Sequence, residues 1–82
     1  MNEMAVAEAV EELAGMMRAD GAELSLVTAD PKTARIEVTL DLDGVECLDC
    51  VLAPDFLEQM LNESLRKSVR GEFELVLHDP RR

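Results

Sequence analysis

The sequence contains no tryptophan and no tyrosine, and Phe56 and Phe73 are its only aromatic residues. Proteins that bind single-stranded nucleic acids usually stack the bases on aromatic rings, which are scarce here. Positive charge is also scarce, because eight Lys and Arg residues against eighteen Asp and Glu residues leave a formal net charge of -10. Nucleic acids and anionic membranes attract basic proteins, so we expect neither as a partner.

Long hydrophobic runs are absent as well. No stretch approaches the roughly 20 apolar residues that cross a bilayer, and residues 1–17 are interleaved with glutamate rather than basic and apolar like a secretory signal. We therefore expect a cytoplasmic protein. The 82 residues allow one domain, residues 1–82, in which 79–82 form a short polar tail.

Periodic apolar residues predict five elements in this chain. Val6, Val10, Leu13 and Met17 have helical spacing after a candidate N-cap, Asn2. Later segments read as two strands, a helix that begins at a proline, and a last strand. The predicted ranges are helix 3–19 closed by Asp20 and Gly21, strands 23–29 and 33–42, helix 54–70 closed by Gly71, and strand 72–78.

The clearest pattern lies in the second strand, where Ile36, Val38, Leu40 and Leu42 alternate with polar residues. Such alternation predicts a sheet with one buried and one solvated face. A hairpin joins the first two strands, and a helix connects the last two, which makes them parallel. The prediction is an α+β fold with two layers in the order α-β-β-α-β, with two helices on one face of a three-stranded mixed sheet.

The chain has two cysteines, Cys47 and Cys50, separated by two residues. In a reducing cytosol this spacing indicates metal or redox chemistry before a structural disulfide. Zinc and iron–sulfur sites normally take four protein ligands, and we interpret the single histidine, His78, as a surface residue. Either two copies pool their cysteines, or outside thiols complete the site, or no metal binds. Zinc bridging a dimer and a dithiol switch are the alternatives.

The residues around the cysteines have opposing expected effects. The predicted helix start at Pro54 would bring amide groups and the positive end of a helix dipole near the thiols, which favours thiolates. Glu46 and Asp49 would disfavour thiolates by charge repulsion, although they could also supply oxygen ligands. No glycine-rich phosphate loop occurs, and no Ser or Cys nucleophile has a nearby histidine. We expect no enzymatic activity.

The order of elements and motifs resembles the C-terminal domain of NifU-type iron–sulfur assembly proteins. In that family an Arg precedes an Asp-Gly turn and an apolar strand, which the segment 18–24 matches through Arg18, Asp20, Gly21, Ala22, Glu23 and Leu24. The family signature Gly-x-Cys-x-x-Cys-Pro has a looser counterpart here, Gly44-x-x-Cys47-x-x-Cys50-Val51. The resemblance covers residues 10–77.

The resemblance implies a function as well as a fold. In the family, the cysteine pairs of two subunits hold a labile [4Fe–4S] cluster that is passed to apo iron–sulfur client proteins. By this resemblance Cys47 and Cys50 are the cofactor and metal ligands, and the protein is a homodimer around the cluster.

Overall fold

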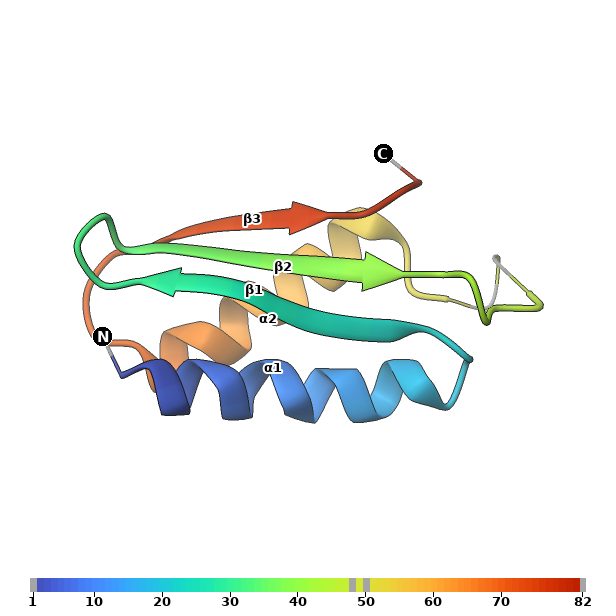
Figure 1. Ribbon diagram of the computed structural model, residues 1–82, viewed down its shortest axis with the longest axis horizontal. Coiled ribbons are helices and arrows are strands. Elements are labelled where there is room, and N and C mark those ends of the chain that lie inside the picture. The colour runs from blue at the N-terminus through green and yellow to red at the C-terminus, as the bar shows by residue number, and fades with distance from the viewer. Residues whose placement is uncertain (1, 48, 50, 82) are drawn as a thin grey trace.

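The computed structural model describes residues 2–47, 49 and 51–81. These described residues form two helices and three strands, which follow one another in the predicted order (Figure 1). Their bounds are α1 Glu3–Arg18, β1 Glu23–Asp30, β2 Arg35–Asp41, α2 Pro54–Ser68 and β3 Glu74–His78.

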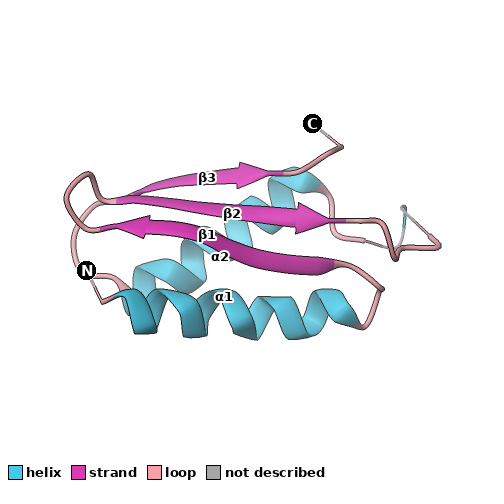
Figure 2. Ribbon diagram, in the orientation of Figure 1, coloured by secondary structure: helices cyan, strands magenta, loops and turns pink. Residues whose placement is uncertain are grey.

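The three strands form one mixed sheet in the order β1-β2-β3. Strand β2 is antiparallel to β1 and parallel to β3, and α2 makes the connection between the two parallel strands. Both helices lie on the same face of the sheet (Figures 1 and 2). The predicted α+β class and two-layer arrangement are therefore confirmed.

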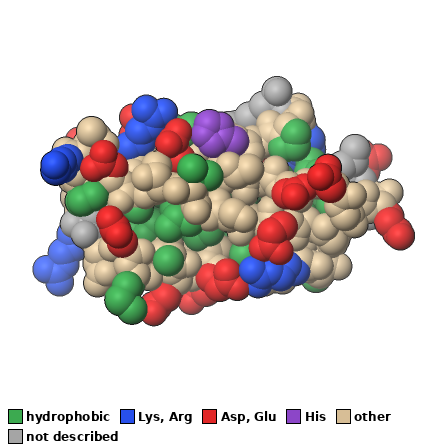
Figure 3. Space-filling view, in the orientation of Figure 1, with side chains coloured by type: hydrophobic (Ala, Val, Ile, Leu, Met, Phe, Trp, Pro, Cys, Tyr) green, Lys and Arg blue, Asp and Glu red, His purple; other side chains and the backbone are tan. Residues whose placement is uncertain are grey.

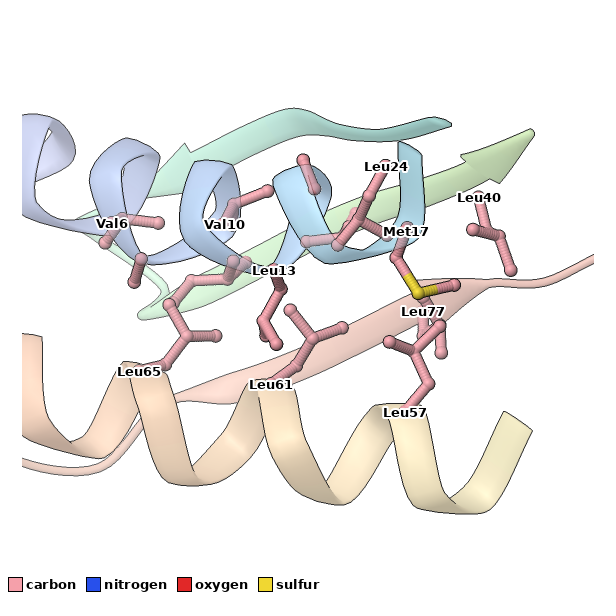
Figure 4. Packing of buried hydrophobic residues seen from close by; sticks show 14 of the residues in the cluster. Val6, Val10, Leu13, Met17, Leu24, Leu40, Leu57, Leu61, Leu65 and Leu77 are labelled. Atoms are coloured by element: carbon pink, nitrogen blue, oxygen red, sulfur yellow. The ribbon is translucent and has the colours of Figure 1, made fainter. Parts of the chain in front are cut away.

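The core lies between the helices and the sheet. Side chains from α1 and α2 point toward one another and toward β2 (Figure 4). The alternation in β2 is confirmed, because Ile36, Val38 and Leu40 are buried while Arg35 and Asp41 are exposed. The buried helix residues include Val6, Val10, Leu13 and Met17 of the stripe predicted in α1. Apolar spacing in the second helix also predicts a stripe of Leu57, Met60, Leu61 and Leu65, of which the three leucines are buried and Met60 is partly buried.

Helix α1 begins where the sequence predicts and ends one residue earlier, at Arg18, before the predicted turn at Gly21. The Asn2 side chain accepts hydrogen bonds from the backbone N–H of Met4 (2.9 Å) and Ala5 (3.4 Å), which satisfies amides that have no partner inside the helix. At the other end Ala22 N–H donates to Met17 O and Gly21 N–H donates to Arg18 O, both at 3.0 Å. This paired closure needs a left-handed residue, and Gly21 has φ +87°.

Strand β1 contains a bulge that the sequence reading does not predict. Its register with β2 shifts between Leu26 and Thr28, and Val27 is exposed. The extra residue changes which side chains face inward, so that Leu24 and Leu26 are followed by Ala29 against the core. In the sequence, the bulge corresponds to a change of the inward-facing residues from even-numbered positions, Leu24 and Leu26, to an odd-numbered one, Ala29.

Several predicted boundaries are wrong by one to two residues. Thr33 and Ala34 belong to the turn before β2, where the Asp30 side chain accepts a hydrogen bond from Lys32 N–H at 2.9 Å. Leu42 follows β2, and residues 72–73 precede β3. Helix α2 ends at Ser68 because Val69 is extended, so Arg70 lies outside it.

An exposed ion-pair cluster connects α1 to β1. The Arg18 guanidinium donates to Glu11 at 2.6 Å and to Glu23 at 2.9 Å. Its hydrogen bond and positive charge hold the pKa of Glu11 below the ordinary value of 4.5. Because the folded pKa is lowered, the interaction stabilises the fold above the unfolded pKa and is lost as pH falls through the folded pKa.

We predict that Arg18→Gln raises the pKa of Glu11 back toward 4.5. The measurement is an NMR titration of the Glu11 side-chain carboxyl in the parent and the variant. Salt should have the same effect on the parent, because both partners are exposed. An unchanged pKa in the variant would show that this pair does not form in solution.

Among the described residues, no helix is both long and apolar enough to span a bilayer.

Candidate functional site

The two cysteines belong to residues 42–53, which connect β2 to α2. Val45 is half-buried and packs against the core, and Val51 is buried within it. Between these two positions Glu46, Cys47 and Asp49 are exposed. The loop is therefore anchored by an apolar side chain on each side, and its described apex residues face solvent.

A close contact between two glycines fixes the start of this loop. A Cβ atom added at Gly21 would lie 2.5 Å from the Gly44 carbonyl oxygen, and one added at Gly44 would lie 2.8 Å from the Gly21 oxygen. Real Cβ atoms do not approach backbone oxygens so closely, so neither position has room for a side chain. The turn after α1 and the start of the cysteine loop thus touch through their backbones. The spacing of Gly44 from Cys47 in the sequence does not reveal this packing role of Gly44.

Cys47 borders a shallow cavity of about 340 Å³ beside this glycine contact. The cavity is otherwise lined by Gly44 and Glu46 of the loop and by Ala19, Asp20 and Gly21 of the turn. Cys47 is disulfide-bonded. Cys50, the other predicted ligand and the only other cysteine of the chain, lies outside the described residues.

The influence of the start of α2 on Cys47 stays a prediction. Helix α2 begins at Pro54 as predicted, but no residue of α2 lines the cavity beside Cys47. The turn that does line it follows the carboxyl end of α1, where the helix dipole is negative. Asp20 and Glu46 also line this cavity, so its described lining carries negative charge.

Charge is unevenly distributed along the molecule. The end with the cysteine loop has exposed carboxylates, and much of the red in Figure 3 lies toward this right-hand end. The turn between β1 and β2 and the end of α2, at the opposite end, contain most of the basic residues. The carboxylates near the loop are Asp20, Asp41, Asp43, Glu46 and Asp49; the distant basic residues are Lys32, Arg35, Arg66, Lys67 and Arg70.

Two cations near the acidic end, Arg18 beside the turn after α1 and Arg81 in the cavity lined by Asp41 and Asp43, are already paired. Arg18 contacts Glu11 and Glu23, and Arg81 contacts the buried carboxylate of Asp79 at 2.6 Å. Their charges are largely balanced within the chain. Among the described residues, the cysteine end therefore carries an excess of negative charge.

The other candidate ligands do not gather around Cys47. Within residues 2–47, 49 and 51–81, no three His, Cys, Asp or Glu side chains are placed to hold a metal ion. Glu46 and Asp49 therefore do not form a mixed site with Cys47 in the described part of one copy. His78 is an exposed strand-end residue, as predicted, and its ring lies 3.3 Å from Glu37 on the open face of the sheet.

No protein-family model, curated protein or solved structure gives a significant match to this chain. The resemblance to NifU-type domains therefore stays a hypothesis based on the motif residues. Two of those residues have structural roles here, since Gly21 closes α1 and Arg18 pairs with Glu11 and Glu23. Their presence is explained by the fold, so the functional argument depends on the cysteine pair.

Proposed function

We propose that this chain is a non-enzymatic iron–sulfur carrier domain in which Cys47 and Cys50 of two copies hold a [4Fe–4S] cluster for delivery to apo client proteins. The observation that supports this best is the exposure of Cys47 on a loop anchored at both sides. Once reduced, an anchored and exposed cysteine can be approached by a second copy and by a client. Buried cysteines could not meet either requirement.

The donor set fits such a cluster in type and, with two copies, in number. Thiolates are the usual protein ligands of iron–sulfur clusters, and four of them complete a [4Fe–4S] site. One chain supplies two cysteines, so two chains supply four. When bound, the cluster would supply iron and sulfide as cargo.

Two properties of the site must be overcome before a cluster binds. Cys47 is disulfide-bonded, and two electrons and two protons are needed to convert a disulfide into two thiols. Two acidic loops must also approach each other, and their repulsion weakens as salt increases. The proposal therefore requires a reductant and predicts better assembly at moderate ionic strength than at low ionic strength.

Anaerobic reconstitution with iron, sulfide and a thiol reductant tests the proposal. We expect a brown dimer with about two iron atoms per chain, and a Cys47→Ala variant that stays colourless. Glu46→Gln is the matched control, because it changes a neighbouring exposed side chain and leaves both sulfurs in place. A cluster of unchanged yield in Cys47→Ala, or a reduced parent protein that binds no iron, would contradict the proposal.

A dithiol–disulfide function is the second candidate, and the disulfide at Cys47 favours it. In this case the pair exchanges two electrons and two protons with a small thiol such as glutathione. A parent protein that forms no cluster but titrates reversibly in glutathione buffers would support this candidate. Zinc at about half an equivalent per chain, with a dimer lost on chelation, would instead indicate the zinc-bridged alternative.

A further inference from the structure

A second concave surface lies next to the cysteine loop, where β2 ends. It has a volume of about 560 Å³ and is mostly apolar. We call it the β2-end groove, and its lining residues are Thr39, Leu40, Asp41, Leu42, Asp43, Pro80 and Arg81. The groove continues directly into the segment that leads to Cys47.

One wall of the β2-end groove is an unpaired portion of a strand. Pairing between β2 and β3 ends at Thr39 and His78. Strand β2 continues, and on its other side Leu40 and Asp41 pair with β1. On the β3 side these two residues have no strand neighbour among the described residues.

Residues 79–81, the described part of the chain beyond β3, leave this position open. Arg81 N–H donates to the Asp79 side chain at 2.9 Å, which turns the backbone after the strand. In Figure 1 this segment bends away from β2 instead of continuing beside it. A short extended segment from another molecule can therefore lie beside β2 and pair with its backbone, a common mode of peptide recognition.

The charges of the groove select the type of segment. Asp41 and Asp43 are exposed and negative, while the Arg81 guanidinium is held by Asp79. A second copy of this chain would bring the same acidic end and be repelled. A segment with lysine or arginine would be attracted, and its apolar side chains could occupy the apolar part of the groove.

We propose that the β2-end groove binds an extended basic segment of a partner protein, with apolar and Lys or Arg side chains in alternation. The segment adds a short strand beside Leu40 and Asp41, and its cations contact Asp41 and Asp43. If the proposed carrier function is correct, the partner is a client protein, and this contact holds the client next to Cys47.

The test is an NMR titration of the isotope-labelled protein with a blocked hexapeptide of alternating Lys and Val. We expect amide shifts concentrated at residues 39–43 and Arg81, and no such shifts with a Glu–Val hexapeptide. Asp43→Lys should weaken binding at least tenfold, and Asp41→Asn should weaken it while keeping an oxygen that can accept the Asp43 N–H. Glu63→Lys on α2 is the control with the same change in net charge.

Equal weakening by Asp43→Lys and Glu63→Lys, or shifts spread over the whole acidic surface, would overturn the groove as the binding site. Absence of binding to the parent protein would overturn it as well. Cluster reconstitution is measured separately and needs no peptide. Peptide binding without cluster formation would contradict the carrier function alone, and cluster formation without peptide binding would contradict the groove alone.

Discussion

Replacing Leu61 by alanine is expected to destabilise the protein by about 2 to 5 kcal/mol, the usual cost of removing a buried leucine side chain. Leu61 is fully buried at the middle of α2, between Leu57 and Leu65, and it points toward α1 (Figure 4). A domain of this length has a total stability of roughly 4 to 12 kcal/mol. The variant therefore loses a large part of its free energy of unfolding, and we expect it to be partly unfolded at room temperature.

Urea unfolding followed by circular dichroism measures this effect through the midpoint and the free energy of unfolding. Met4→Ala is the matched control, since Met4 is 74% exposed in the first turn of α1. Its expected change is within about 0.5 kcal/mol. A similar loss in both variants would mean that α2 does not pack on α1 as described.

Replacing Gly21 by alanine is the second change with a large expected effect. Its φ of +87° is unfavourable for alanine by about 1 to 2 kcal/mol, and the new Cβ would lie 2.5 Å from the Gly44 oxygen. Because the Cβ is fixed directly to the backbone and the Gly44 oxygen is a backbone atom, the turn and the cysteine loop must move apart. We expect a total loss of about 3 kcal/mol or more, together with altered NMR shifts around Cys47.

Variants of the other glycines separate the cost of the positive φ from the cost of the steric conflict. Gly71 has φ +88° but no atom within 4 Å of an added Cβ, so Gly71→Ala should show the conformational cost alone. Gly44→Ala has the steric conflict without a positive φ. Gly15→Ala, in open space within α1, should stabilise the fold by up to about 1 kcal/mol. If Gly21→Ala costs no more than Gly71→Ala, the contact between turn and loop is absent in solution.

Most of the fold could be predicted because each element has its own periodic signal. Alternation of Ile36, Val38 and Leu40 identifies the buried face of β2, and Leu57, Leu61 and Leu65 identify that of α2. Such patterns survive because burial of one face dominates the energy of an amphipathic element. The bulge at Val27 is harder to predict, because its only signal is one change from even to odd apolar positions within a short strand.

The surroundings of the cysteines could not be predicted in the same way. Spacing along the chain placed Cys47 near the start of α2, yet its cavity is lined by the turn after α1. Apolar residues do not recur at a regular interval in residues 43–53, so the sequence does not predict which way this loop runs. The contact of Gly21 with Gly44 also joins positions more than twenty residues apart, which local patterns cannot reveal. Likewise, Asp79 belongs to a predicted polar tail but is 7% exposed and paired with Arg81.

The two outer strands also bear on how the protein behaves when it is concentrated. An exposed sheet edge can pair with the edge of another molecule and start aggregation. Here β1 is interrupted by its bulge, and β3 is only five residues long with Glu74 and His78 exposed at its ends. Irregular or short charged edges are poor templates for intermolecular sheets, so the bulge that realigns Ala29 with the core also helps to keep separate molecules apart.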